Sequence, residues 1–415
     1  MITPILCFEI RNYIYLTLAP SMAAKHIFVL DNGGFNIKAG FANNSEPRVM
    51  PNAVMKAKSE RRRPFIGDQL DECRDVSGLY YILPVQKGYL INWDTQKDVW
   101  DYLMGKDCFN VHINSMSLVL TQPYLNFQSV QEGLSEYWFE EMECESFLTI
   151  NPGTLSAYKY GKENPSELCC LVVDCGYSFT HLIPYVQGKK ITEFVHRIEI
   201  GGKMLTNHLK DIISYRQLNV MDETYVINQL KEDTCFVSTD FNGDMAIAQK
   251  KGKDNPYVVD YVLPDFTTIR RGYVRPKDEA GSGEQVIRMN NERFAVPELL
   301  FHPSDIGIQQ MGISEAIVYV IEQFPSEVQY HLYKNVLLIG GSCSLPNFKE
   351  RVEKDVRTMA PAECEVRINL ASNPVTDAWR GGCVLTKDPQ FSSQLVTRRE
   401  YEEHGFSLCL QRFDV

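Results

Sequence analysis

The clearest pattern of apolar and polar positions is a strand–turn–strand unit that occurs twice. Residues 26–41 read HIFVLDNGGFNIKAGF, and residues 168–186 read LCCLVVDCGYSFTHLIPYV. In each, an apolar, β-prone run ends in Asp, a turn that contains Gly follows, and a second β-prone run returns. The pattern predicts two β-hairpins, with Gly33 and Gly176 in turns that a side chain would obstruct.

A third apolar run at 335–352, NVLLIGGSCSLPNFKERV, predicts a buried strand, the pair Gly340-Gly341 and then a helix. We expect this helix to begin near Leu345, with Pro346 in its first turn. Helical periodicity also occupies 95–103, 129–141 and 205–215. Strands that alternate with helices predict an α/β architecture. The repeated hairpin suggests duplicated lobes that face one another across a cleft.

Length and composition narrow the class of protein. The 415 residues exceed the size of one small core, so two lobes of ordinary domain size are expected. A net charge of -11 argues against a surface that binds nucleic acid throughout. We find no apolar run of the ~18 residues that a membrane-spanning helix needs. The 12 cysteines are scattered without zinc-ligand spacing, which favours a reducing compartment, cytosol or nucleus.

Two segments are interpreted as additions to the lobes. Residues 1–24 are largely apolar, but Glu9 and Arg11 interrupt the apolar stretch, and no basic region precedes it. We therefore expect an N-terminal extension rather than a signal peptide. Met22 could be the start of the folded protein. The segment 265–284 is rich in Gly, Arg, Lys and Ser, lacks periodicity and predicts an insertion loop.

The repeated hairpin also points to chemistry. Amides of Gly-containing turns cradle phosphate oxygens, and the carboxylates of Asp31 and Asp174 would hold waters around Mg²⁺. Lys38 would reach a phosphate as a compact positive charge. Gly340-Gly341 would let a nucleotide lie close to a helix N-terminus. Each Asp alone is more often a turn-former, but the duplication together with the Gly-Gly turn favours a nucleotide site.

With these residues the chain resembles actin and the actin-related proteins. Further segments follow in the family's order: INWD (91–94), GGKMLTNHL (201–209), LKEDTCFV (230–237), NERFAVPELLFHPSDIG (291–307) and LIGGS (338–342). The resemblance runs from about Lys25 to the end of the chain. It implies the two-lobed α/β fold that actin shares with Hsp70 and sugar kinases, with ATP or ADP and Mg in the cleft.

The resemblance also implies a division of the chain and a set of cofactor contacts. The expected parts are the extension 1–24, a first lobe over 25–160, a second over 161–370 with the insertion 265–284, and a segment 371–415 that returns to the first lobe. Lys231 and Glu232 match family residues beside the ribose and base. The expected cofactor contacts are Asp31, Gly33, Lys38, Asp174, Gly176, Gly202, Lys231, Glu232, Gly340 and Gly341, with Asp31 and Asp174 reaching the metal through water.

Departures from the family pattern predict poor ATP hydrolysis. Pro152 stands where actin has a glutamine that orients the attacking water, and proline has no side-chain donor or acceptor. Neighbouring Asn151 could substitute, but its side chain should point elsewhere. Tyr177 replaces a second acidic residue of the second hairpin. Near the base, Leu345 and Val375 replace an aromatic residue and a lysine.

Filament formation is also disfavoured. The segment between Pro51 and Ile66 is shorter than the matching actin loop and reads AVMKAKSERRR in place of an apolar plug. Asp305 stands in the apolar plug of the opposite lobe, where a buried unpaired carboxylate costs several kcal/mol. The basic residues from Lys56 to Arg63 fit a nuclear-import signal, a nucleosomal DNA contact or a solvated loop.

Four segments resemble one nuclear class of actin-related protein beyond general actin similarity: SGLYYILPVQKGYLINWD, NPSELCCLVVDCGYSFTH, ISYRQLNVMDETYVINQLKED and YVLPDF. The class implies a non-catalytic scaffold subunit of a chromatin-remodelling complex that exchanges a histone variant. Its implied partners are the remodelling ATPase and a small zinc-finger HIT subunit, with nucleosomes and histones contacted indirectly. The implied location is the nucleus and also the cytoplasm, with no membrane and no homopolymer. The alternatives are an actin-fold ATPase or phosphoryl-transferring enzyme and a cytoskeletal filament former.

Overall fold

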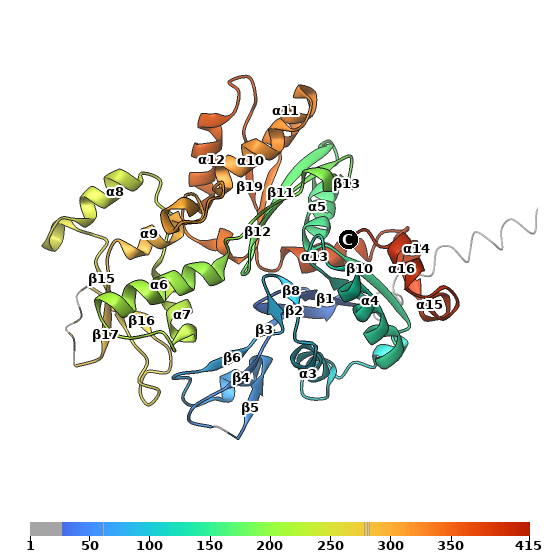
Figure 1. Cartoon of the computed structure of the whole chain (residues 1–415), viewed down its shortest axis with the longest axis horizontal. Coiled ribbons are helices and arrows are strands. Elements are labelled where there is room, and N and C mark those ends of the chain that lie inside the picture. The colour runs from blue at the N-terminus through green and yellow to red at the C-terminus, as the bar shows by residue number, and fades with distance from the viewer. Residues whose placement is uncertain (1–26, 61, 278, 280, 282) are drawn as a thin grey trace, which may run out of the picture. The chain divides into compact units, whose positions relative to one another are not determined.

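The computed structural model describes residues 27–415 except 61, 278, 280 and 282, and it is drawn in Figure 1. The predicted extension 1–24, with Met22, and Arg61 of the basic segment lie outside the described residues. Contacts divide the described chain into two compact units. The first holds the residues up to 50, 100–159 and 378–415, and the second holds 51–99 and 160–377. The lobe boundaries expected from the sequence stay predictions.

The first unit is built on a mixed sheet of order β20-β10-β9-β1-β2-β3. Its strands are β1 Ile27–Asn32, β2 Asn36–Phe41, β3 Arg48–Pro51, β9 Ser117–Thr121, β10 Ser146–Ile150 and β20 Val396–Thr397. β1, β9 and β10 run parallel, and β2 returns antiparallel to β1. The helices with residues in this unit are α3 Trp93–Met104, η3 Ile113–Ser115, α4 Gln128–Glu136, η4 Tyr137–Glu141, α5 Pro152–Glu163, α13 Asp377–Leu385, α14 Phe391–Gln394, α15 Arg398–His404 and α16 Phe406–Arg412.

The core of the first unit explains why the C-terminal helices belong to it. Trp379 of α13 is buried and packs in one cluster with Val29 of β1 and Leu155 of α5. Its indole Nε1 donates to the Val29 carbonyl at 3.1 Å. Gly40 of β2 allows this approach, because an added Cβ would lie 3.2 Å from the indole ring. Burial of one large aromatic side chain therefore joins α13 to β1 and α5.

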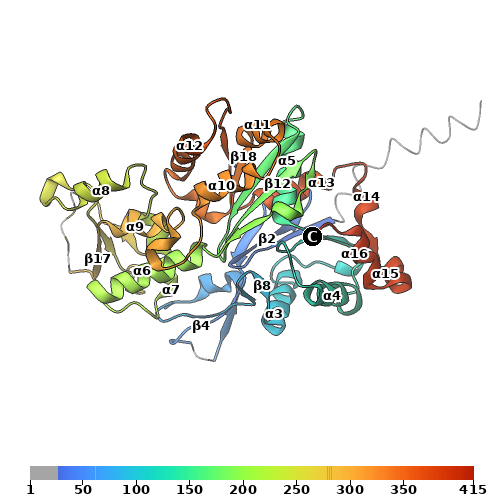
Figure 2. The same ribbon diagram turned by 45° about the horizontal axis from the view of Figure 1, so that its top comes forward.

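The second unit contains a sheet of order β13-β12-β11-β18-β19, with β14 paired to β12. Its strands are β11 Cys169–Cys175, β12 Thr180–Val186, β13 Lys189–Lys190, β14 His196–Ile198, β18 Val336–Ile339 and β19 Ile368–Leu370. The helices are α6 Gly202–Arg216, α7 Thr224–Thr234, α8 Phe241–Ala248, α9 Glu292–Glu298, α10 Ile313–Glu322, α11 Ser326–Lys334 and α12 Phe348–Met359. In Figure 2, α10 and α12 lie beside each other, as their contacts require.

Three smaller sheets complete the second unit, with orders β5-β4-β6, β7-β8 and β16-β15-β17. Their strands are β4 Val54–Lys56, β5 Pro64–Ile66, β6 Tyr80–Ile82, β7 Val85–Gln86, β8 Tyr89–Leu90, β15 Val259–Val262, β16 Tyr273–Val274 and β17 Val286–Met289. The 3₁₀ helices of the unit include η2 Gly67–Glu72, η5 Thr192–Phe194, η6 Gly252–Asp254, η7 Pro303–Ile306 and η8 Gly341–Ser344.

The two predicted hairpins are confirmed as β1–β2 and β11–β12, and the predicted helices as α3, α4 with η4, and α6. The start of the helix after β18 was predicted too early. It begins at Phe348, because Gly341–Ser344 forms a 3₁₀ turn and Asn347 has a φ of 65°, which an α-helix excludes.

Within the described residues of the segment 265–284, which was predicted to be a loop, a short strand is present. Tyr273–Val274 forms β16 and pairs with β15. Arg275 lies 3.0 Å from Glu284 and 3.9 Å from Asp260, and its side chain is 14% exposed. These ion pairs connect Arg275 to β15 and to the last residue of the segment, Glu284. No periodic pattern in the sequence indicates these contacts.

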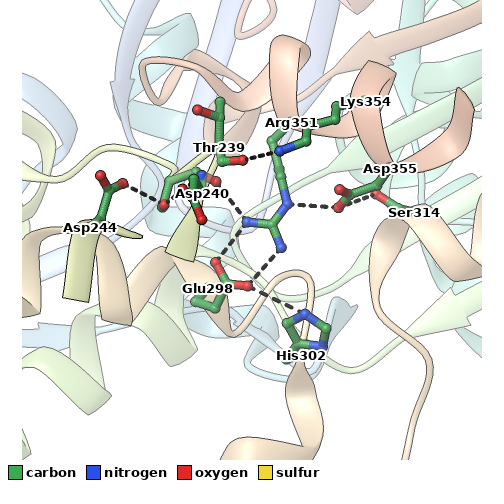
Figure 3. A network of polar contacts seen from close by, with 10 residues as sticks. Thr239, Asp240, Asp244, Glu298, His302, Ser314, Arg351, Lys354 and Asp355 are labelled. Carbon is green, nitrogen blue, oxygen red and sulfur yellow. Dashed lines mark hydrogen bonds and ion pairs between the residues drawn. The ribbon is translucent and has the colours of Figure 1, made fainter. Parts of the chain in front are cut away.

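A buried ion-pair network joins three parts of the second unit (Figure 3). Arg351 of α12 donates from Nη1 and Nη2 to both carboxylate oxygens of Glu298 in α9, at 2.9 and 2.7 Å. Its Nε donates to Asp355 at 2.7 Å, and Nη1 donates to the Ser238 carbonyl at 2.7 Å. Since Ser238 precedes α8, one guanidinium fixes α9, α12 and the start of α8 relative to one another.

Candidate functional site

The first hairpin presents Asp31 and Lys38 opposite each other. They are register partners on β1 and β2, and the Lys38 ammonium lies 3.0 Å from Asp31 Oδ2. Thr121 at the end of β9 donates from its hydroxyl to Asp31 Oδ1 at 2.7 Å. Thr121 Oγ1 in turn accepts from the backbone N–H of Asn32 at 2.9 Å. The carboxylate is thus held in one orientation at the carboxyl ends of two parallel strands.

Gly33 is required by the turn of this hairpin. A Cβ built there would lie 2.6 Å from the Asn36 carbonyl oxygen and 3.1 Å from the Lys38 Nζ. Any side chain would therefore displace the turn and the lysine together. The geometry fits the predicted role of a tight turn beside a phosphate, and the phosphate contact itself stays a prediction.

Pro152 is the first residue of α5, in the same unit. Proline is tolerated at a first helical position because its missing N–H has no helical acceptor there. The preceding Asn151 is fully buried, and its side-chain amide donates to the Gln122 carbonyl at 3.0 Å. The Asn151 side chain is therefore turned toward the β9–α4 loop, as expected from the sequence.

In the second unit, Asp174 is the next-to-last residue of β11 and the register partner of His181 on β12. The turn is closed by the Gly176 N–H, which donates to the Phe179 carbonyl at 3.0 Å. Burial, with Arg197 and His196 nearby, lowers the pKa of His181 to about 3, so the imidazole is neutral at neutral pH. It packs on the Phe179 ring at 4.3 Å between centroids, which is a packing role.

Gly340 brings the turn after β18 against this hairpin. Its φ of 92° and ψ of 157° belong to a region that essentially only glycine adopts. An added Cβ would lie 2.4 Å from the Cys175 carbonyl oxygen and 2.9 Å from Asp174 Oδ1. Gly341, in contrast, has nothing within 4 Å of its Cβ position. The predicted Gly-Gly turn therefore contains one obligatory glycine and one that only leaves space open.

The N-terminus of α6 is joined to the second hairpin through backbone bonds. The Gly202 N–H donates to the Gly176 carbonyl at 3.0 Å, and the Lys203 N–H donates to the Tyr177 carbonyl at 2.9 Å. Gly201 has no room for a side chain, since its Cβ would lie 2.5 Å from the Tyr177 carbonyl oxygen. Gly176 and Gly202, both predicted cofactor contacts, are thus brought together.

Lys231 of α7 lies close to Gly202, and its ammonium donates hydrogen bonds to three protein acceptors. It donates to Asn228 Oδ1 at 2.9 Å, Thr206 Oγ1 at 3.0 Å and the Gly202 carbonyl at 3.3 Å. Burial lowers its pKa. Glu232, the other residue predicted beside the ribose and base, is exposed and accepts from the Asn228 amide at 2.8 Å.

The fit to a magnesium nucleotide therefore differs between its two halves. The glycine-containing turns, together with the fixed carboxylate of Asp31 and the ammonium of Lys38, are groups that suit phosphates and a hydrated metal. The nucleoside side offers a buried lysine whose three N–H groups already have acceptors. Within the described residues no group of three or more His, Cys, Asp or Glu could bind a metal directly. The eleven cysteines among the described residues form no disulfide with one another.

Sequence reasoning missed the residues that position the predicted ones. Thr121 lies 90 positions from the Asp31 that it contacts, and Thr206 and Asn228 share the ammonium of Lys231. Their only signal is a polar residue at the end or on the inner face of an apolar element.

No helix in the described part of the chain is long and apolar enough to span a bilayer.

Comparison with known proteins places this geometry in a family. The family model described as Actin matches residues 22–414. The chain is 46% identical to Actin-related protein 6 of Drosophila melanogaster, over 94% of this chain and 100% of that protein. It is 40% identical to Actin-like protein ARP6 of Cryptococcus neoformans, over 94% and 85% of the two chains. It is 36% identical to Actin-related protein 6 of Arabidopsis thaliana, over 94% and 99%.

These matches confirm both levels of the resemblance, the actin-like α/β fold and the particular class of actin-related protein that four segments indicated. The family generally binds nucleotide with Mg, and the phosphate-side residues of this chain are of the kind that such binding needs. With a family match over nearly its whole length, and relatives of one class in animals, fungi and plants, the chain belongs to the actin family.

Proposed function

We propose that this protein is a non-catalytic scaffold subunit of a nuclear chromatin-remodelling complex of the histone-variant-exchange type. Membership of the actin family and similarity to proteins named Actin-related protein 6 support the general class. The nuclear complex is implied by the resemblance of the chain to that class. Activity then comes from partner subunits, and the actin-like fold supplies surfaces for assembly.

The observation that carries the non-catalytic part is the start of α5. Hydrolysis needs a side chain that orients the attacking water, typically within hydrogen-bond reach. Pro152 has no such group, and the amide of Asn151 is buried on the Gln122 carbonyl. To replace the missing glutamine, Asn151 would have to leave that bond unmade, which costs roughly 1–3 kcal/mol.

A second group that hydrolysis would need is also missing, because Tyr177 replaces the acidic residue of the family. Burial raises the pKa of its phenol to about 12. The group is therefore neutral throughout the physiological range, so it cannot act as the carboxylate that would help to hold the metal's waters or accept a proton. A phenol that is protonated at neutral pH is a weak base and no metal-cage ligand.

The partners proposed by resemblance are the remodelling ATPase and the small zinc-finger HIT subunit, with histones contacted indirectly. The proposed location is the nucleus, and also the cytoplasm.

Two observations bear on which surfaces are available for filament or DNA contacts. Asp305 of η7 is exposed, so a filament contact there would have to bury a carboxylate. In the basic segment, Lys58 pairs with Asp222 and Arg63 pairs with Glu72, which favours a solvated loop.

ATP turnover tests the proposed lack of catalysis. We expect the purified protein with Mg-ATP to release phosphate no faster than the Asp174→Ala variant, since the residues that would activate water are replaced. The readout is phosphate release at saturating ATP, with actin as a positive control. Turnover well above background that Asp174→Ala abolishes would show that the chain is an ATPase.

A further inference from the structure

The turn between β4 and β5 presents an exposed serine in a basic stretch of sequence. Residues 56–63 read KAKSERRR, so Ser59 has basic residues on both sides along the chain. Ser59 lies in the turn, outside both strands, and is exposed. Its hydroxyl donates to the Asp75 carbonyl at 3.1 Å. Such a serine is accessible to another protein, and its basic flanks suit a binding groove that carries acidic residues.

A pocket of about 620 Å³ lies beside this serine, within the second unit. It is lined by Ser59, Glu60, Arg63, Glu72 and Arg74. Glu60 is half-buried, and the other four residues are exposed. The lining therefore combines one hydroxyl with two guanidinium groups and two carboxylates. A phosphate group on the hydroxyl would have room in this pocket and would meet both arginines there.

Arg63 is already held at the pocket. Its guanidinium lies 4.8 Å from the centroid of the buried Phe65 ring, and it pairs with Glu72. The two side chains of this pair are 48% and 60% exposed, so the pair contributes little to stability and is easily exchanged. A phosphate dianion carries more charge than a carboxylate and offers three acceptor oxygens. It therefore competes well with Glu72 for the same guanidinium.

Arg74 supplies a second guanidinium. It lies two residues after Glu72, and it forms no ion pair with any residue that the structure describes. Lys58 is directed elsewhere, since its ammonium lies 3.3 Å from Asp222, just before α7. The cations that line the pocket are therefore two arginines, whose planar forks match phosphate oxygens in pairs.

We propose that Ser59 is a phosphorylation site for a serine/threonine protein kinase that selects basic substrates, and that Arg63 and Arg74 bind the resulting phosphate. Ser59 Oγ attacks the γ-phosphorus of ATP held by the kinase, and the Oγ–P bond forms as the bond to the β,γ-bridging oxygen breaks. ADP leaves, and the hydroxyl proton passes to a carboxylate of the kinase. The inference goes beyond the proposed scaffold function and does not depend on it.

The modification exchanges one set of contacts for another. The esterified Oγ has no proton, so the Asp75 carbonyl loses its bond from Ser59 and keeps the weaker one from the Cys73 thiol, at 3.2 Å. The phosphate in turn displaces Glu72 from Arg63. Phosphorylation would thus release the β4–β5 turn from Asp75 and attach it to the two arginines.

Treatment of the full-length protein with protein kinase C and Mg-ATP, followed by phosphopeptide mass spectrometry, tests the modification. We expect phosphate on Ser59, loss of that label in Ser59→Ala, and slower labelling when Lys56→Glu and Arg62→Glu remove the basic flanks. Ser304 is the internal control, because it is exposed but followed by Asp305. Labelling of Ser59 no faster than of Ser304 would overturn the proposal.

Phosphorus NMR of the phosphorylated protein tests binding in the pocket. Nearby cations favour the dianion, so the second pKa of the phosphate should fall below its ordinary value of about 6. Arg63→Ala and Arg74→Ala should each raise this pKa again. Glu72→Gln should lower it further, since it removes the competing carboxylate. Thermal unfolding checks that each variant is folded.

Arg62→Ala is the matched control for the NMR titration. Arg62 is an exposed arginine of the same turn that does not line the pocket, so its removal should leave the pKa of the phosphate close to that of the unsubstituted protein. An ordinary phosphate pKa that does not respond to Arg74→Ala would overturn the proposed binding by the pocket. Equal responses to Arg62→Ala and Arg74→Ala would do the same, because they would show only the general charge of the turn.

Discussion

Replacement of Arg351 by alanine is expected to lower the free energy of unfolding by about 3–5 kcal/mol, the range found when one partner of a buried ion pair is removed. The Arg351 side chain is 8% exposed and that of Glu298 is 2% exposed. The substitution would leave the Glu298 carboxylate buried without its guanidinium and the Ser238 carbonyl without its donor. Guanidinium denaturation followed by circular dichroism measures the loss.

Lys354, one turn further along α12, provides the control. Its ammonium makes a hydrogen bond at 2.6 Å to the Thr239 carbonyl in an exposed position. Lys354→Ala should therefore change stability by no more than about 0.5–1 kcal/mol. If Arg351→Ala proved as mild as Lys354→Ala, the network of Figure 3 would not be what fixes α9 to α12.

Gly340→Ala is expected to destabilise the protein by roughly 2–3 kcal/mol or more and to disturb the second hairpin. The backbone conformation at Gly340 alone costs another residue about 1–3 kcal/mol. The new methyl group would also meet the Cys175 carbonyl at 2.4 Å and Asp174 Oδ1 at 2.9 Å. Thermal unfolding reports the loss, and amide hydrogen exchange over β11 and β12 reports the disturbance.

The adjacent glycine is the matched comparison for this change. Gly341 has no positive φ, and nothing lies within 4 Å of its Cβ position. Gly341→Ala should therefore be neutral or slightly stabilising, because alanine restricts the unfolded chain. Similar losses for both substitutions would mean that the close approach of the β18 turn to Asp174 does not determine stability here.

The sequence was most informative where chemistry requires a local backbone shape. An apolar run that ends in Asp-x-Gly can form little except a strand that enters a tight turn, and both hairpins follow it. Gly33 could be singled out because its turn excludes a side chain, whereas Gly340-Gly341 was predicted only as a pair and the structure shows that Gly340 alone excludes one. Pro152 could be placed only through the resemblance of INPGTLSAY (150–158) to the matching actin segment, and the structure puts it at the start of α5, a helix that was not predicted.

Contacts between segments that are distant along the chain could not be predicted from the sequence. Nothing near Lys231 indicates that its ammonium is bonded to Thr206 and Asn228. The early helix start predicted at Leu345 has a similar origin. Pro346 is compatible with a first helical turn, but the αL conformation of Asn347 depends on the packing of η8.

The central claim, a scaffold subunit that acts through an assembly, is tested most directly by purification of the tagged full-length chain from nuclear extract. Mass spectrometry then identifies the subunits that co-purify, and gel filtration gives the size of the particle. We expect a remodelling ATPase and a small zinc-finger HIT protein at fixed ratios to this chain. Recovery of the chain alone, or as a homopolymer that sediments without these subunits, would contradict the claim.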